Sequence, residues 1–157
     1  MNEPLVIGFG NPLREDDGLG WKAAELVEAR TGGAARVIVC HQLTPELAAD
    51  LARAPHAIFL DASLTEAPGT VRELALRPAD GWSCTHHLTP AQLLAIALEL
   101  AGTLCPSVLI TGGAYRTGTG ERLTPAAERC ARRMAELACR ILARRLPHGE
   151  PATSPRR

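Results

Sequence analysis

Acidic and imidazole side chains occur at three points of the sequence where an apolar run gives way to a loop or a helix. Asp16 and Asp17 follow the first apolar run, Asp61 closes the third, and His86 and His87 precede an amphipathic segment. In open α/β sheets the carboxyl ends of parallel strands meet at one edge, which carries the binding site. Two carboxylates and an imidazole at that edge can hold a divalent cation with positions open for water or a substrate group.

These residue types leave the identity of the metal open, since two oxygens and one nitrogen suit zinc, nickel, manganese or iron. Each side chain also has an ordinary structural explanation. Asp16 or Asp17 could cap the following helix, and Asp61 could form a turn. A histidine in a loop is more often incidental than ligating. The prediction of a site therefore depends on the three points coming together in space.

The stretch "VIGFGNPLREDDGLG" also resembles a phosphate-binding turn, because glycines between a strand and a helix let backbone N–H groups contact an anion. A dinucleotide fingerprint requires a third glycine, whereas Leu13 occupies that position here. The adjacent carboxylates would repel phosphate. Nucleotide binding remains a minor alternative, and calorimetric titration with nucleotides tests it.

Short apolar runs alternate with alanine- and leucine-rich stretches of helical spacing. The runs predict strands at 5–9, 37–40, 57–60, 71–76 and 108–111. Three helices are expected to begin at Thr-Pro pairs, in which the threonine caps the first turn and proline has no N–H to leave unpaired. These pairs are Thr44-Pro45, Thr89-Pro90 and Thr124-Pro125. The alternation predicts an α/β fold in three layers, α/β/α, with a twisted, mostly parallel five-stranded sheet in which strand 70–76 is a candidate for antiparallel pairing.

The 157 residues predict a single α/β domain over 1–146 and a flexible C-terminal tail over 147–157, where proline and glycine replace the apolar pattern. Seventeen basic and seventeen acidic residues cancel, so neither nucleic acid nor an anionic membrane is an expected partner. No apolar run is long enough to span a bilayer, and no signal peptide is recognisable. We expect a cytoplasmic monomer.

Five cysteines without a C-x-x-C pair indicate reduced, mostly buried thiols rather than disulfides or a zinc knuckle. Cys40 and His41 are neighbours at a strand end, but adjacent side chains on a strand point to opposite faces, which argues against a nucleophilic pair. We expect this loop to shape a substrate groove.

Three segments, in this order and at these separations, carry a family resemblance: "GFGNPLREDDGLG", "FLDAS" and "CTHHLTPAQLL". They look like those of the nickel-iron hydrogenase maturation endopeptidases, with further similarity in "HQLTPELA" and in the "LTP" before the last helix. The resemblance covers residues 5–146. It implies a mostly parallel sheet between helices and an enzyme that removes a short C-terminal extension from the hydrogenase large-subunit precursor after nickel insertion.

The resemblance also implies the site residues. It places the metal-binding groups on Asp17, Asp61 and His86, with His87 as a neighbour that a one-residue shift in register would exchange for His86. Asp17 and Asp61 are the candidate catalytic residues. Many members of the family carry glutamate where this chain has Asp17, so the carboxylate arm is shorter here. The nickel is expected to be carried by the substrate rather than tightly bound by the enzyme.

The same ligands would also serve a non-catalytic assembly factor that binds the nickel-loaded precursor without cutting it. The length of the precursor after incubation distinguishes the two hypotheses. The residues do not establish whether nickel acts in catalysis or only in recognition.

Overall fold

A computed structural model describes residues 3–81 and 87–145. Within them lies a five-stranded sheet in the order β2-β1-β3-β5-β4. The strands are β1 (Leu5–Phe9), β2 (Arg36–Cys40), β3 (Ala57–Ser63), β4 (Val71–Ala75) and β5 (Ser107–Gly113). The helices are η1 (Glu15–Gly18), α1 (Leu19–Thr31), α2 (Leu47–Arg53), α3 (Pro90–Ala101) and α4 (Pro125–Arg145).

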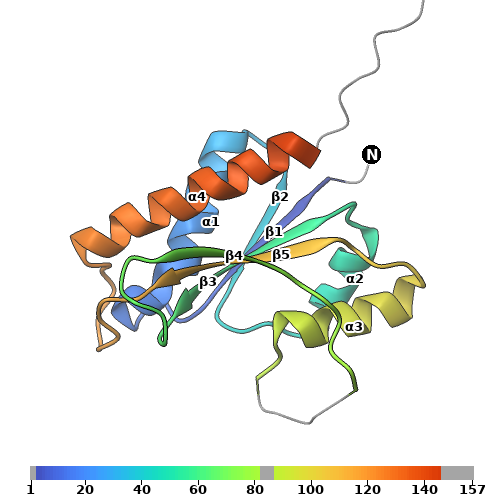
Figure 1. Cartoon of the computed structure of the whole chain (residues 1–157), viewed down its shortest axis with the longest axis horizontal. Coiled ribbons are helices and arrows are strands. Elements are labelled where there is room, and N and C mark those ends of the chain that lie inside the picture. Colours follow the sequence, from blue (N-terminus) through green and yellow to red (C-terminus); the bar gives the residue numbers. More distant parts are fainter. Residues whose placement is uncertain (1–2, 82–86, 146–157) are drawn as a thin grey trace, which may run out of the picture.

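The helices cover both faces of the sheet, so the predicted three-layer architecture is confirmed (Figure 1). Helices α1 and α4 pack on one face, against a cluster that contains Ile58, Leu60 and Ile110. Helices α2 and α3 pack on the other face, where the strands contribute Ile7 and Phe59. Alternate residues of β3 therefore enter opposite cores, as strand geometry requires.

The strand predictions are confirmed, including the antiparallel member. Strands β1, β2, β3 and β5 are parallel, and β4 runs antiparallel to β5. Strands β3 and β5 continue beyond their predicted ends, because Asp61 to Ser63 pair with Thr111 to Gly113. This extension carries Asp61 on the strand itself rather than in a turn after it.

Two of the three predicted helix starts are confirmed. Thr89 forms a full capping box with Gln92, and the Thr124 hydroxyl accepts a hydrogen bond from the Ala127 N–H. The prediction that Thr44 caps a helix is wrong, because α2 begins only at Leu47 and has no side-chain cap. The Thr44 carbonyl instead accepts from the Leu47 N–H, so a tight turn precedes this helix. The predicted tail at 147–157 lies outside the described residues.

Helix α1 lies unusually close to the sheet at Gly20. A Cβ atom added there would stand 2.3 Å from the Leu60 carbonyl oxygen and 2.7 Å from that of Phe9. The glycines of the opening motif thus serve close packing between helix and strand. They bring the turn that contains Asp17 down onto the sheet edge.

We therefore expect Gly20→Ala to destabilise the protein by about 2 to 3 kcal/mol, because overpacking against rigid backbone cannot be relieved by a side-chain rotation. Chemical denaturation measures the change. Glu25→Ala, an exposed position of the same helix, is the control and should leave the unfolding midpoint nearly unchanged. Equal midpoints for Gly20→Ala and the wild type would refute the close-packing explanation.

None of the described helices combines the length and apolarity needed to cross a membrane.

Candidate active site

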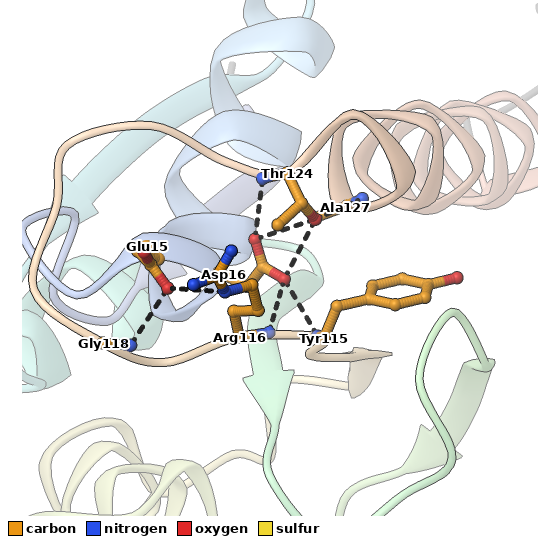
Figure 2. A network of polar contacts seen from close by, with 7 residues as sticks. All are labelled: Glu15, Asp16, Tyr115, Arg116, Gly118, Thr124 and Ala127. Atoms are coloured by element: carbon orange, nitrogen blue, oxygen red, sulfur yellow. Dashed lines mark hydrogen bonds and ion pairs between the residues drawn. The ribbon is translucent and has the colours of Figure 1, made fainter.

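Asp16 is fully buried and holds together two loops that lie about a hundred residues apart in the sequence (Figure 2). One carboxylate oxygen accepts hydrogen bonds from the N–H groups of Tyr115 and Arg116, both at 2.9 Å. The other accepts from the N–H of Thr124 at 3.0 Å, and the Thr124 hydroxyl contacts both oxygens. Both oxygens of Asp16 are therefore occupied by donors within the protein, and Asp16 is an anchor of the fold.

Glu15 adds a second clamp to the same loop. It has a left-handed backbone conformation (φ 49°), and its carboxylate accepts from the Gly118 N–H at 3.1 Å. Arg116 approaches this carboxylate to 3.8 Å. Neither the clamp nor the role of the loop 114–124 was predicted from the sequence. The sequence signal for this clamp is the pair of glycines in "YRTGTGER", Gly118 and Gly120, because a side chain at either position would crowd Glu15.

Asp17 is held by the motif that precedes it. Its carboxylate accepts a hydrogen bond from the Asn11 N–H at 3.0 Å, and the Asn11 side chain accepts in turn from the Leu13 N–H. Gly10 has a φ of +135°, and a Cβ there would stand 2.3 Å from the Asp17 carbonyl oxygen. Glycine and asparagine thus shape a turn that directs Asp17 to the sheet edge. The suggestion that Asp16 or Asp17 caps the next helix is wrong, because α1 is preceded by Gly18 without a side-chain cap.

Asp61 reaches the same edge from β3. The pKa of its carboxyl is raised to about 7, mainly because the side chain is buried. The negative charge of Asp17 raises this pKa further, whereas the hydrogen bond from the Ala62 N–H, at 2.8 Å, lowers it. The negative charge of Asp17 therefore acts on Asp61, which is largely shielded from water. Such a pair can share a proton or bind a cation, since either relieves the repulsion between the charges.

The structure describes only one of the two histidines of the "CTHHLTP" segment. His86 lies outside the described residues, and His87 is exposed just before α3. Within 3–81 and 87–145, no three histidine, cysteine or acidic side chains gather closely enough to hold a metal ion. The assignment of His86 as the third ligand remains a prediction.

The described cysteines are free thiols, two of them buried and two half-buried. Burial raises the pKa of the Cys40 thiol, which disfavours the reactive thiolate. The neighbouring His41 ring instead packs edge-on against Trp21, with 5.4 Å between ring centroids. The Trp21 indole N–H donates to the Cys40 carbonyl at 2.8 Å, which fixes the end of β2 beside the site. These contacts agree with a structural role for this loop.

A fold of this kind is found in the proteases that mature hydrogenases. The chain is similar to the hydrogenase maturating endopeptidase HybD from E. coli, at 24% sequence identity over 90% of this chain and 93% of that one, with a TM-score of 0.70. It is also similar to the [NiFe] hydrogenase maturation protease HycI from Thermococcus kodakarensis, at 24% identity over the same shares of the two chains, with a TM-score of 0.73. No protein-family model matches the sequence, and no curated protein sequence matches it. The chain thus shares the whole fold of these proteases.

Proposed function

We propose that the protein is an endopeptidase that removes the C-terminal extension of a nickel-iron hydrogenase large-subunit precursor after nickel insertion. The observation that carries the proposal is the position of Asp61 near the carboxyl end of β3, where the negative charge of Asp17 acts on it and raises its pKa. The fold shared with maturation endopeptidases over nine-tenths of the chain supports it. The family resemblance of the motifs supports it independently.

In this proposal nickel arrives as part of the substrate. The Asp17 and Asp61 carboxylates supply hard, anionic oxygens, and the repulsion between them falls when a cation lies between them. His86 would supply the nitrogen. Because burial favours the neutral form of Asp61, a precursor that carries the cation would displace a proton from this carboxyl on docking. We further propose that the enzyme acts as a monomer in the cytoplasm.

Two readouts test the activity itself. Intact-protein mass spectrometry of the precursor after incubation should give a loss equal to one C-terminal peptide. A stable complex with a full-length precursor would instead indicate an assembly factor that does not cut. Unchanged precursor without a complex would refute both functions.

Substituting His86 and His87 one at a time distinguishes their roles. We expect His86→Ala to lose processing of the nickel-loaded precursor, whereas His87→Ala should keep most of it, because neighbouring side chains in a loop seldom reach one ion. A cleavage time course with each variant measures this. Loss in His87→Ala with activity in His86→Ala would reverse the assignment, and full activity in both would remove histidine from the mechanism.

A further inference from the structure

Strand β2 is an outermost strand of the sheet, and half of its backbone groups are unpaired. Alternate residues of such a strand bond to the neighbouring strand, and the others point away from it. The Arg36 N–H and the Cys40 carbonyl form hydrogen bonds at the two ends of β1, so the even-numbered residues of β2 face β1. The N–H and C=O groups of Val37 and Val39, here termed the open side of β2, therefore point outward. They have no partner in the described part of the chain.

The open side of β2 lacks the usual protection against an added strand. Proteins protect an outermost strand with charged side chains or proline. Strand β4, at the other side of the sheet, carries Arg72 and Glu73, both exposed. Residues 37–40 of β2 read "VIVC", without charge or proline, and Val39 is 37% exposed. Two outward donors and two outward acceptors in line are the complement of an extended polypeptide, which would add a strand to the sheet.

The carboxyl end of β2 lies beside the turn that holds Asp17. The Cys40 carbonyl accepts from the Gly10 N–H at 3.2 Å and from the Trp21 indole N–H at 2.8 Å. Gly10 in turn lies against the Asp17 backbone, since an added Cβ there would stand 2.3 Å from the Asp17 carbonyl oxygen. A strand paired with β2 would lie two strand spacings, about 10 Å, from β1, and about three residues of extended chain cover that distance.

We propose that the open side of β2 binds an extended segment of the hydrogenase precursor as an added strand, a few residues from the bond that is cut. This inference rests on the proposed function and names the way in which the substrate backbone is held. The occupant is a precursor segment rather than a second copy of this chain. Two five-residue strands paired by themselves bury far less than the about 1,000 Å² of a stable dimer interface. A short strand pair suffices for the precursor, because the carboxylates hold it as well.

Proline substitutions in the full-length protein test the open side of β2. The Val39 N–H points away from β1, so Val39→Pro should stay folded while it removes an outward donor and obstructs the added strand. We expect the KM for nickel-loaded precursor to rise about tenfold, and kcat to change by less than about twofold because uniform binding is lost. Glu73→Pro is the matched control, since the Glu73 N–H points outward from β4. This variant and Val39→Thr, which keeps the N–H, should retain the wild-type KM.

Amide hydrogen exchange measures the pairing directly and does not depend on the folding of Val39→Pro. In the free wild type, the N–H groups of Val37 and Val39 should exchange rapidly. Saturating nickel-loaded precursor should slow the exchange of these two amides within β2 by about tenfold or more, and leave the exchange of β4 unchanged.

The outcomes separate this inference from the proposed function. If the wild type cleaves the precursor, either an unchanged KM in a folded Val39→Pro or unchanged exchange at Val37 and Val39 overturns the added strand, and the proposed function stands. If the wild type does not cleave, the proposed function fails, and exchange with the precursor present decides: slower exchange of these amides supports the added strand, and unchanged exchange overturns it. Slow exchange in the free enzyme, with a dimer that Val39→Pro makes monomeric, would assign the open side to self-association and overturn the proposal.

Discussion

Asp17→Asn and Asp61→Asn should each reduce processing of the nickel-loaded precursor on the order of a hundredfold or more, while both variants stay folded. Each substitution keeps the size of the side chain and removes the charge that a cation requires. Asparagine at 61 also keeps the oxygen that accepts from the Ala62 N–H. Precursor cleavage and circular dichroism measure the two properties. Normal processing by either variant would take that residue out of the site.

Asp61→Asn should at the same time stabilise the protein in a pH-dependent way. The pKa of Asp61 is raised from 3.8 to about 7, so the folded state holds a proton that the unfolded chain has already released. Wild-type stability therefore falls as pH rises from about 4 to 7, and the loss is complete above the folded pKa. At pH 8 the asparagine variant should be more stable by about 2 to 4 kcal/mol, with the difference vanishing below pH 4. If the free energies of unfolding of the two proteins differed by the same amount at every pH, the effect would not come from the ionisation of Asp61.

Asp16→Ala should have the opposite effect and unfold the protein more easily by about 3 to 5 kcal/mol. The substitution leaves the N–H groups of Tyr115, Arg116 and Thr124 without their acceptor and detaches the loop 114–124 from the opening turn. Thermal unfolding should show a midpoint lower by about 10 °C or more.

The neighbouring carboxylate provides the control for this prediction. Asp17→Ala removes a side chain of the same type one position further on, whose carboxylate accepts from a single donor, the Asn11 N–H, among residues 3–81 and 87–145. It should cost about 1 kcal/mol and eliminate processing. The two adjacent aspartates would then have different roles: Asp16 would anchor the fold and Asp17 would act in processing. A larger loss of stability in Asp17→Ala than in Asp16→Ala would reverse these roles.

The sequence predicts the fold well because its local signals agree with the tertiary structure. Strand-length apolar runs, two of the three Thr-Pro helix starts and the alternation of elements lead to the five-stranded sheet that is observed. Asp17 and Asp61 can be placed at the same edge because parallel strands deliver their carboxyl ends there.

The role of Asp16 could not be predicted from the sequence, because its partners lie about a hundred residues away and are backbone N–H groups apart from the Thr124 hydroxyl. The clamp of Glu15 on Gly118 also joins distant parts of the sequence, and the loop glycines are its only sequence signal. The prediction for Thr44 is wrong because the same Thr-Pro pair that starts two helices here begins only a tight turn before α2. Tertiary context decides between these outcomes.

We predict that this protein cuts its precursor only after nickel has been inserted. The most direct test incubates the purified protein with nickel-loaded and nickel-free precursor in parallel and measures intact masses over time. We predict the loss of a C-terminal peptide from the nickel-loaded precursor and none from the nickel-free one. Equal cleavage of both precursors would contradict nickel recognition, and an unchanged mass in both would contradict the proposed peptidase activity.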